Sequence, residues 1–420
     1  MQNKKHSSSH LLAHCLGVSQ KTLRDAYMAR ESYVVHKIKK RFGGVRIIHE
    51  PPELLKYVQK RILFAIFYPM FRNNCIDENM FGFLPGRSIA DNAYEHTKQP
   101  WNFLYKLDLK DAFPSVRNID LSIALRTIML SKTQEIVDKF NKFEERHAEL
   151  IASREDRPVH RLFKREPHSD TYKVHTFSFK TILGRNSETS WFRELLLGTK
   201  EEYLRAQVLM VEVSSMIADL CTSPSGFLPQ GAPTSGFALN AVATHIGILN
   251  VLRNQLYFIG CKFQHQASMY ADDIAFSTMK KISWESMQRI IASIESLGVW
   301  KINPDKIYEY DRRSTGPIVC GMRIGRYRIH SKDQCDFLYQ YSGTNHKHLV
   351  QKIKNGENWS IDFITIPKKL KKKIRALEYK LKMDPDNKAL RKVVLGYRGY
   401  MIDIIRKSRM PKGVFAGRKW

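Results

Sequence analysis

The sequence predicts a mixed α+β fold, in which short apolar strands alternate with amphipathic helices. Buried strands are expected within residues 104–109 and 267–278, where β-branched and aromatic residues are enriched. A hairpin is expected over residues 33–48, where apolar and polar residues alternate around Gly43-Gly44. With 420 residues, the chain is long enough to build a large core with several lobes.

Helices are expected where apolar residues recur at intervals of three and four. The first 40 residues are interpreted as largely helical, with Ser19 as a candidate cap. Pro51-Pro52 ends the hairpin, and Leu54 to Phe71 then follow helical spacing. An amphipathic helix is predicted after Asn240 from a single apolar stripe that contains Leu239, Val242, Ile246 and Leu249.

The C-terminal region predicts a second pair of helices with strongly basic surfaces. The stripe of the first helix contains Leu370, Ile374, Leu377 and Leu381. Asp386 can cap the second helix, whose stripe contains Leu390, Val393, Tyr397 and Ile404. By contrast, the region from about 130 to 220 has mixed charge and is interpreted as an insertion.

The composition indicates a folded protein with a polyanionic partner. A hydrophobic content of 43% excludes a disordered chain. The 69 basic and 41 acidic residues give a net charge of +28, and nucleic acid is the usual partner of such a charge. Residues 347–420 alone hold 21 basic and 6 acidic side chains, so this region is the main candidate, although a solvated basic tail is the alternative.

Cysteine spacing and hydropathy bear on where the protein is expected to work. The six cysteines never form Cys-x-x-Cys, which argues against a zinc ribbon and against a disulfide framework. The longest apolar run, residues 62–71, is about half the length of a membrane span, and no secretory signal is predicted. We therefore expect a soluble, cytoplasmic protein in a reducing compartment, without a membrane partner.

Three acidic residues are candidates for metal chemistry. Asp272 and Asp273 lie between two apolar segments, and adjacent acids in a tight hairpin repel each other unless a cation lies between them. Asp108 emerges from another apolar strand. Three carboxylates on neighbouring strands could bind two Mg²⁺ ions, which suits nucleotidyl transfer. A solvent-exposed turn would also tolerate an Asp-Asp pair, so the pair alone is a weak signal.

Three motifs together resemble those of reverse transcriptases. Tyr270-Ala271-Asp272-Asp273 resembles the Y-x-D-D box of that family, and Asp108 with Phe113 resembles its first catalytic motif. Leu228 to Ser235 resembles the L-P-Q-G-x-x-x-S segment that lies between them, and the three occur in the family's order. The resemblance extends from about Lys37 to Gly325 and implies an RNA-directed DNA polymerase.

The resemblance assigns roles to individual residues. It implies that Asp108, Asp272 and Asp273, with the Leu109 carbonyl, hold two Mg²⁺ ions, for which Mn²⁺ could substitute. Lys306 matches the lysine that can protonate pyrophosphate. Phe113 matches the steric gate that rejects a ribose 2′-hydroxyl. The residues expected to bind the incoming dNTP are Arg46, Lys40, Asp111, Ala112, Phe113, Gln230 and Gly231.

Other residues are expected to bind template or product. Arg87, in a second family motif, is expected to brace the template or the fingers. Asn92 and His96 belong to an Asn-Ala-x-x-His box that resembles one in retron reverse transcriptases. The basic residues of the C-terminal lobe expected to contact nucleic-acid phosphates are Lys368, Lys369, Lys371, Lys372, Lys373 and Arg375.

The subfamily follows less directly from the motifs. Val319-Cys320-Gly321 stands where retrons carry Val-Thr-Gly, and this departure, with the insertion, favours the neighbouring defence-associated reverse transcriptases. The expected function is therefore extension of DNA on a cognate structured noncoding RNA, in antiphage defence. A retron enzyme that makes a branched RNA-linked DNA is the first alternative, and a non-catalytic RNA-binding protein on a polymerase fold is the second.

The resemblance also implies a right-hand architecture. Residues 1–103 are expected to form the fingers with an N-terminal helical segment. Residues 104–330 are expected to form a ferredoxin-like palm that includes the insertion, and residues 331–420 a basic helical thumb. The expected partners are the template RNA, the nascent cDNA and dNTPs. The sequence identifies neither an effector protein nor a homo-oligomer.

Overall fold

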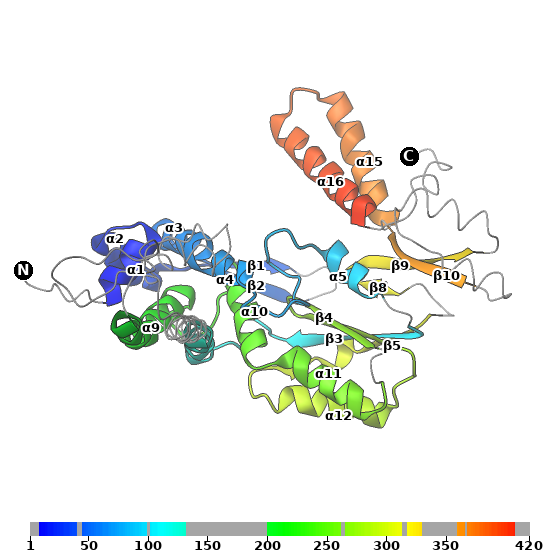
Figure 1. Ribbon diagram of the computed structural model, residues 1–420. Coiled ribbons are helices and arrows are strands. Elements are labelled where there is room, and N and C mark those ends of the chain that lie inside the picture. Colours follow the sequence, from blue (N-terminus) through cyan, green and yellow to red (C-terminus); the bar gives the residue numbers. More distant parts are fainter. Residues whose placement is uncertain are drawn as a thin grey trace, which may run out of the picture. The chain divides into compact units, whose positions relative to one another are not determined.

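The computed structural model describes residues 8–39, 44–98, 101–131, 200–261, 265–312, 317–329, 359–365 and 368–407. It confirms the mixture of helices and sheets (Figure 1). The chain forms two compact units, one of residues 1–77 with 111–246 and the other of residues 78–110 with 247–420. These units divide the chain at other places than the expected fingers, palm and thumb, whose boundaries stay a prediction. Most of the expected insertion lies outside the described residues.

The first unit consists of helices and one hairpin. The hairpin pairs β1 (Val34–Lys39) with β2 (Val45–Glu50), as predicted. The Ser19 side chain accepts a hydrogen bond from the Thr22 amide and caps α2, so this prediction is also confirmed. Residues 118–131 are helical as well. The other elements are α1 (Ser8–Leu16), α2 (Gln20–Met28), a 3₁₀ turn (Ala29–Ser32), α3 (Glu53–Ile62), a π turn (Leu63–Phe67), α4 (Tyr68–Arg72), α9 (Lys200–Cys221) and α10 (Ser235–His245).

Helix α10 is buried and packs against the π turn Leu63–Phe67. Every residue from 235 to 243 is buried, so the helix has no solvent-facing side. Phe237 stacks on Phe67, with ring centroids 4.5 Å apart. Burial of two such rings contributes several kcal/mol in total, because each large side chain contributes about 1.5–3 kcal/mol.

The prediction of one amphipathic helix through residues 239–249 is wrong. Gly247 has φ +72°, a left-handed conformation that an α-helix cannot contain, so α10 ends at His245 and α11 (Ile248–Phe258) begins after it.

Within the described ranges, no single helix is long and apolar enough to cross a membrane. The bent pair of α10 and α11 is long and apolar enough only when the two helices are taken together.

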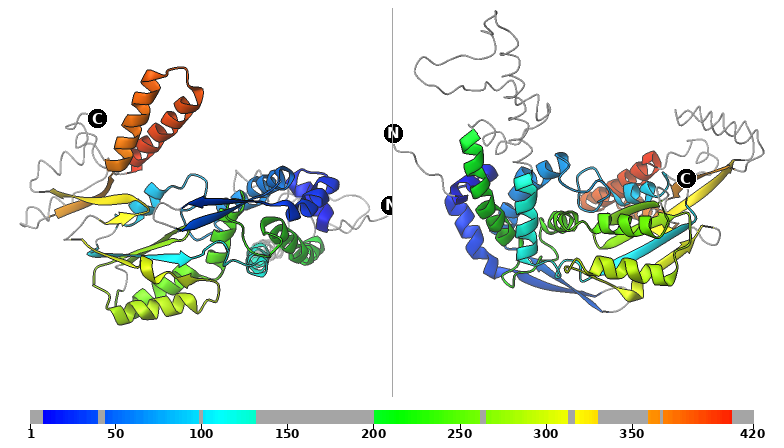
Figure 2. Two further views of the ribbon diagram at one scale, coloured as in Figure 1. Left: turned by 180° about the vertical axis from the view of Figure 1, so that it is seen from behind. Right: turned by 60° about the horizontal axis from the view of Figure 1, so that its bottom comes forward.

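The second unit is built around a five-stranded antiparallel sheet. Its order is β4 (His265–Tyr270), β5 (Asp273–Thr278), β3 (Phe103–Lys110) and β6 (Lys301–Ile302), with β7 (Tyr308–Asp311) also paired to β3. Helices α11 and α12 (Trp284–Glu295) lie side by side along the sheet, where α11 contacts β4 and α12 contacts β6 (Figures 1 and 2). The strands expected at 104–109 and 267–278 are therefore confirmed.

A second sheet and three helices complete this unit. The sheet has the order β10 (Trp359–Thr365), β9 (Met322–Ile329) and β8 (Ile318–Val319). Helix α5 (Ile89–Glu95) contacts both β4 and β9, so it joins the two sheets. A capping box between Ser88 and Asp91 fixes the start of α5. The buried cluster between these elements contains Ala90, Ala93, Trp101, Leu104, Ala275, Val319, Met322 and Ile324.

Helices α15 (Lys368–Met383) and α16 (Lys388–Lys407) form the expected C-terminal pair (Figure 1). The predicted cap of α16 is wrong by one residue, because Asn387 rather than Asp386 accepts the Leu390 amide at 2.9 Å. One residue of the predicted stripe is wrong in the same way, since Val394 is buried and Val393 is 46% exposed. One residue turns a helix face by about 100°, so a small error in register exchanges the inside and the outside.

A short segment before α5 lies against the end of β4. The Phe81 amide donates to the Met269 carbonyl at 2.8 Å, and the Met269 amide donates to the Asn79 carbonyl at 2.9 Å. This pairing brings Gly82 so close to the next turn that a Cβ there would lie 2.6 Å from the Ala271 amide nitrogen. The position therefore requires glycine for space.

We predict that Gly82→Ala lowers the free energy of unfolding by about 1–3 kcal/mol, because both partners in the close contact are backbone. Urea unfolding followed by circular dichroism measures the change. Gly396→Ala is the matched control: it lies inside α16 with nothing within 4 Å, so the higher helix propensity of alanine should stabilise the chain by up to about 1 kcal/mol. Equal stability of the Gly82→Ala variant and the wild type would contradict the described contact.

Candidate active site

The register of the large sheet brings the three candidate acids to one end. Asp108, near the end of β3, lies directly opposite Asp273, the first residue of β5. Asp272 precedes it in the turn, where its carbonyl accepts the Leu109 amide at 2.9 Å. Three side chains that are far apart in the sequence are thus neighbours because two antiparallel strands pair.

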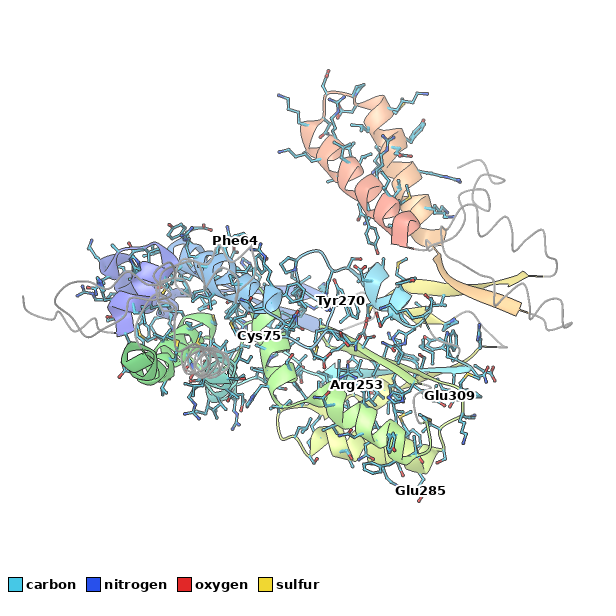
Figure 3. All side chains as sticks on the ribbon, in the orientation of Figure 1. Phe64, Cys75, Arg253, Tyr270, Glu285 and Glu309 are labelled. Atoms are coloured by element: carbon cyan, nitrogen blue, oxygen red, sulfur yellow. The ribbon has the colours of Figure 1, made fainter. Side chains whose placement is uncertain are left out.

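The turn between β4 and β5 is tight and strained. Tyr270, labelled in Figure 3, pairs with Asp273, which leaves only Ala271 and Asp272 to make the turn. Ala271 has φ +56°, a conformation that costs an ordinary residue about 1–2 kcal/mol. The packing of Gly82 against this turn helps to hold it, and such strain is often found at functional sites.

The electrostatics of the site reflect three carboxylates in a partly dry environment. Asp108 is only 7% exposed. Burial raises the pKa of Asp272, and the nearby carboxylates of Asp273 and Asp108 raise it further. Two lysines offset this repulsion: Lys306 Nζ lies 2.9 Å from both carboxylate oxygens of Asp108, and Lys106 Nζ lies 3.4 Å from Asp273 Oδ1. The hydrogen bond to Asp108 raises the pKa of Lys306.

The donor chemistry of this site fits a hard divalent cation. Carboxylate and carbonyl oxygens are the ligands that Mg²⁺ prefers, and strand pairing brings the carboxylates of Asp108 and Asp273 opposite each other, beside Asp272. Across the part of the chain that the structure describes, no three His, Cys, Asp or Glu side chains form a ready-made metal cluster. Asp108 and Asp273 are paired with Lys306 and Lys106 instead, so the lysines would share these oxygens with a bound cation or release them.

Cys320 contacts one of the three acids, Asp273, in a way that the sequence did not indicate. Its thiol donates to Asp273 Oδ2 at 3.7 Å, and Asn92 Nδ2 donates to its sulfur at 3.1 Å. Burial, together with the charge of Asp273, raises the pKa of Cys320 to about 12. Sequence reasoning treated Cys320 only as a departure from the retron pattern. No local signal places it beside an acid 47 residues away.

The prediction that Asn92 and His96 contact nucleic acid is wrong, because both side chains are buried in α5 and the turn after it. His96 Nδ1 lies 3.0 Å from the hydroxyl of Ser277, and Nε2 lies 2.8 Å from that of Ser268. Burial lowers the pKa of His96 to about 3, so the ring is neutral. His96 therefore attaches the end of α5 to the large sheet, whereas Asn92 bonds to Cys320 in the turn between β8 and β9.

Arg87 braces its own chain. Its guanidinium donates to the Met80 carbonyl at 2.6 Å and to the Glu78 carbonyl, and it lies over the Phe81 ring. These bonds hold the segment that pairs with β4. Contact between Arg87 and a template stays a prediction.

The residues expected to bind the dNTP lie mainly in the first unit. The Gln230 carbonyl accepts the His49 amide at 2.8 Å, which ties this segment to β2, the strand that carries Arg46. Gly231 has φ +126°, and a Cβ there would lie 2.7 Å from the Ile48 side chain. Close packing on β2 is therefore one reason for this glycine, besides the predicted approach of a nucleotide. Lys40 lies outside the described residues.

Residues 111–116 form a tight turn after β3. Asp111 has φ +47°, and its carbonyl accepts the Ser115 amide at 3.0 Å. Ala112 is buried and Phe113 is half-buried within this turn. The turn fixes the backbone of the candidate gate, whose role stays a prediction.

The predicted basic surface lies on α15. Lys372, Lys373 and Arg375 are exposed, whereas Lys371 is half-buried. Lys373 also bonds to the hydroxyl of Tyr397 on α16 at 2.5 Å. Lys368 and Lys369 begin the helix, but their side chains lie outside the described parts of the chain.

Comparison with known proteins finds relatives in sequence, two of which are retron reverse transcriptases, whereas no family model matches. The chain is 38% identical over 110 residues to the Retron Mx65 reverse transcriptase of Myxococcus xanthus, which covers 25% of this chain and 24% of that protein. It is 32% identical over 87 residues to the Retron Ec73 reverse transcriptase of Escherichia coli, which covers 21% and 26%. The chain thus spans about a quarter of the length of these curated relatives.

Among solved structures, two telomerases are similar to this chain. Apo telomerase from Candida tropicalis, truncated from its C-terminal domain, has a TM-score of 0.33 and 12% identity, covering 68% of this chain and 51% of that one. Telomerase from Candida albicans with a fragment of telomeric RNA has the same TM-score and identity, covering 69% and 45%. The sequence relatives, both retron reverse transcriptases, support the resemblance drawn from the motifs.

Proposed function

We propose that this chain is an RNA-directed DNA polymerase of the retron type, which extends DNA on a structured RNA template. One observation carries the proposal: Asp108 lies in register with Asp273 and beside Asp272, with Lys306 bonded to Asp108. Three mutually repelling carboxylates of this kind gain little for a fold alone, but they suit nucleotidyl transfer.

Asp108, Asp272, Asp273 and the Leu109 carbonyl are the residues that would hold Mg²⁺ or Mn²⁺. When bound, two such ions would activate the primer hydroxyl and neutralise charge on the triphosphate. The protein itself orients the ligands. The Asn303 amide donates to the Asp108 carbonyl at 2.8 Å, and the Asn303 side chain lies 3.5 Å from Asp108 Oδ2, so the end of β3 is fixed from two sides.

Lys306 would act as the general acid. Its raised pKa keeps the Nζ ammonium protonated at neutral pH, and its side chain is half exposed. The ammonium could therefore give a proton to an oxygen of the departing pyrophosphate. Arg46, Gln230 and Gly231 would bind the triphosphate and the new base pair, and Phe113 would exclude ribonucleotides.

Both described relatives are retron reverse transcriptases, which supports the retron alternative over the defence-associated subfamily that Val319-Cys320-Gly321 and the insertion favoured. A retron enzyme would start synthesis from a 2′-hydroxyl of its own RNA and leave DNA joined to RNA. Sequencing the nucleic acid that co-purifies with the chain, before and after alkali, tests this reading. A role in antiphage defence, a cytoplasmic location and the right-hand division of the chain belong to the same proposal.

Replacing Asp272 and Asp273 with Asn should abolish dNTP incorporation on an RNA template, a loss on the order of 10³-fold or more. The fold should remain, and thermal stability should be equal or higher, because Asn removes the buried charge and the like-charge repulsion that together raise the pKa of Asp272. Primer extension and thermal unfolding of the same preparation measure both effects.

The exposed Asp386 provides the control, since Asp386→Asn removes a carboxylate far along the chain from these acids and should leave incorporation unchanged. Incorporation at the wild-type rate by the double variant would refute the assignment. A large loss of stability would instead identify the pair as structural.

Phe113→Ala should lower the ratio of kcat/KM for dNTPs to kcat/KM for rNTPs by at least about tenfold, which is roughly 1.4 kcal/mol. The physical reason is that a smaller side chain leaves room for a 2′-hydroxyl. Single-nucleotide kcat/KM values with both substrates measure the ratio. If activity falls while the ratio stays the same, Phe113 is a packing residue.

The basic face of α15 should contribute strongly to nucleic-acid affinity. Replacing Lys368, Lys369, Lys372 and Arg375 with Gln should flatten the slope of log K against log[salt] by about 3–4 units, since each phosphate contact contributes about 0.9. Binding of an RNA–DNA duplex at several salt concentrations measures the slope.

A control variant should lose the same number of positive charges from other helices. In it, Gln replaces four exposed basic residues: Lys21, Arg24, Lys60 and Arg289. Its slope should change less, because these residues do not share one helix face. Equal slopes for the two variants would mean that only the net charge matters and that α15 is not a specific phosphate-binding surface.

A further inference from the structure

The turn between β8 and β9 holds an unusual residue for its conformation. Val319 pairs with Met322, so Cys320 and Gly321 alone make the turn, with φ +46° and +79°. Two-residue hairpin turns with positive φ at both positions favour Asn-Gly or Gly-Gly. Cysteine at the first position is strained, and a strained residue that persists invites a functional explanation.

The side chain of Cys320 lies between two polar groups that come from distant parts of the sequence. Asn92, on α5, is fully buried and donates from Nδ2 to the sulfur at 3.1 Å. The thiol in turn donates to Asp273 Oδ2 at 3.7 Å. The buried Asn92 amide therefore fixes the sulfur, and the sulfur contacts the carboxylate.

The other oxygen of Asp273 is fixed from another direction. Lys106 Nζ lies 3.4 Å from Oδ1, so the carboxylate is contacted through both of its oxygens. A carboxylate contacted on both sides has a defined rotation about its terminal bond. That rotation decides which lone pairs are available to a cation, and a lysine contact at one oxygen alone would not define it.

We propose that Cys320, held by Asn92, is a positioning residue that orients the Asp273 carboxylate for binding of a divalent cation. The inference rests on the proposed function, because that function assigns Asp273 as a ligand. It explains why a thiol remains at a position where asparagine or glycine would fit the backbone better. It also gives the buried Asn92 a role in the site that does not require contact with nucleic acid.

The test uses Mn²⁺ as the probe and the full-length chain. Cys320→Ala removes the donor and keeps the strain, Cys320→Gly removes both, and Cys320→Ser keeps a donor. Replacing a residue that orients a metal ligand typically lowers the affinity for the metal by 10- to 100-fold. We expect Mn²⁺ affinity, measured by electron paramagnetic resonance, to fall at least about tenfold for Ala and Gly and to stay near the wild type for Ser.

Stability separates this effect from unfolding. Cys320→Gly relieves the positive φ, so its melting temperature should equal or exceed that of Cys320→Ala, although both lose the thiol. Weaker Mn²⁺ binding in the more stable variant cannot come from a damaged fold. Cys75→Ala, which removes a thiol in the other compact unit, should leave Mn²⁺ affinity unchanged.

A double-mutant cycle tests whether Asn92 acts through the sulfur. Asn92→Ala should weaken Mn²⁺ binding in the wild-type background and have little further effect in the Cys320→Ala background. If Ala and Gly at position 320 leave Mn²⁺ affinity unchanged, the inference is overturned, whatever the polymerase assay gives. If the wild type binds Mn²⁺ through Asp273 but incorporates no dNTP, the proposed function fails and the positioning role stands.

Discussion

The antiparallel pairing of β3 with β5 is the constraint on which the rest of the site depends. It places Asp108 opposite Asp273 in a partly dry environment, where like charges repel strongly. The strands gain their stability from the apolar residues behind the acids, where Tyr105 and Phe276 stack with ring centroids 5.1 Å apart. A stable sheet can therefore carry an unfavourable cluster at its end, and the surroundings of that cluster are built to tolerate it.

Different residues around the cluster support its backbone conformation and offset its negative charge. Gly82 and the paired segment before it support the strained turn at Ala271, and Arg87 holds that segment through backbone carbonyls. Lys306 and Lys106 offset the charge, each on a different acid. Geometry and electrostatics thus have different supports, so a change in one need not disturb the other.

Sequence reasoning succeeded where the signal is local. The hairpin of β1 and β2, the strands of the large sheet and the cap at Ser19 follow from alternation, turn residues and side-chain chemistry within a few positions. The three acids were found because each stands in a recognisable string. That they are neighbours also depends on strand pairing, which the motif order allowed us to anticipate.

The predictions failed where the structure depends on contacts with distant parts of the chain, or where a shift of one residue changes which side of a helix is buried. Gly247 divides an apolar stripe that looks continuous in the sequence. The break was not predicted, because the spacing of apolar residues carries no information about a single positive φ. Asn92 and His96 look like polar surface residues, yet both are buried: His96 bonds to serines of β4 and β5, and Asn92 Nδ2 donates to the sulfur of Cys320. These partners are 172 or more positions away in the chain, beyond the reach of any argument from a short stretch of sequence.

Because two lysines pair with the acids, folding of the chain does not depend on cation binding. In small metal-dependent domains, the unfolded chain and the empty site are the same state, because the cation supplies the folding free energy. Here the ammonium groups of Lys306 and Lys106 already supply positive charge to Asp108 and Asp273. The chain can therefore reach its folded state before it meets a cation, and a chelator should act on it as a reversible inhibitor, not as a denaturant.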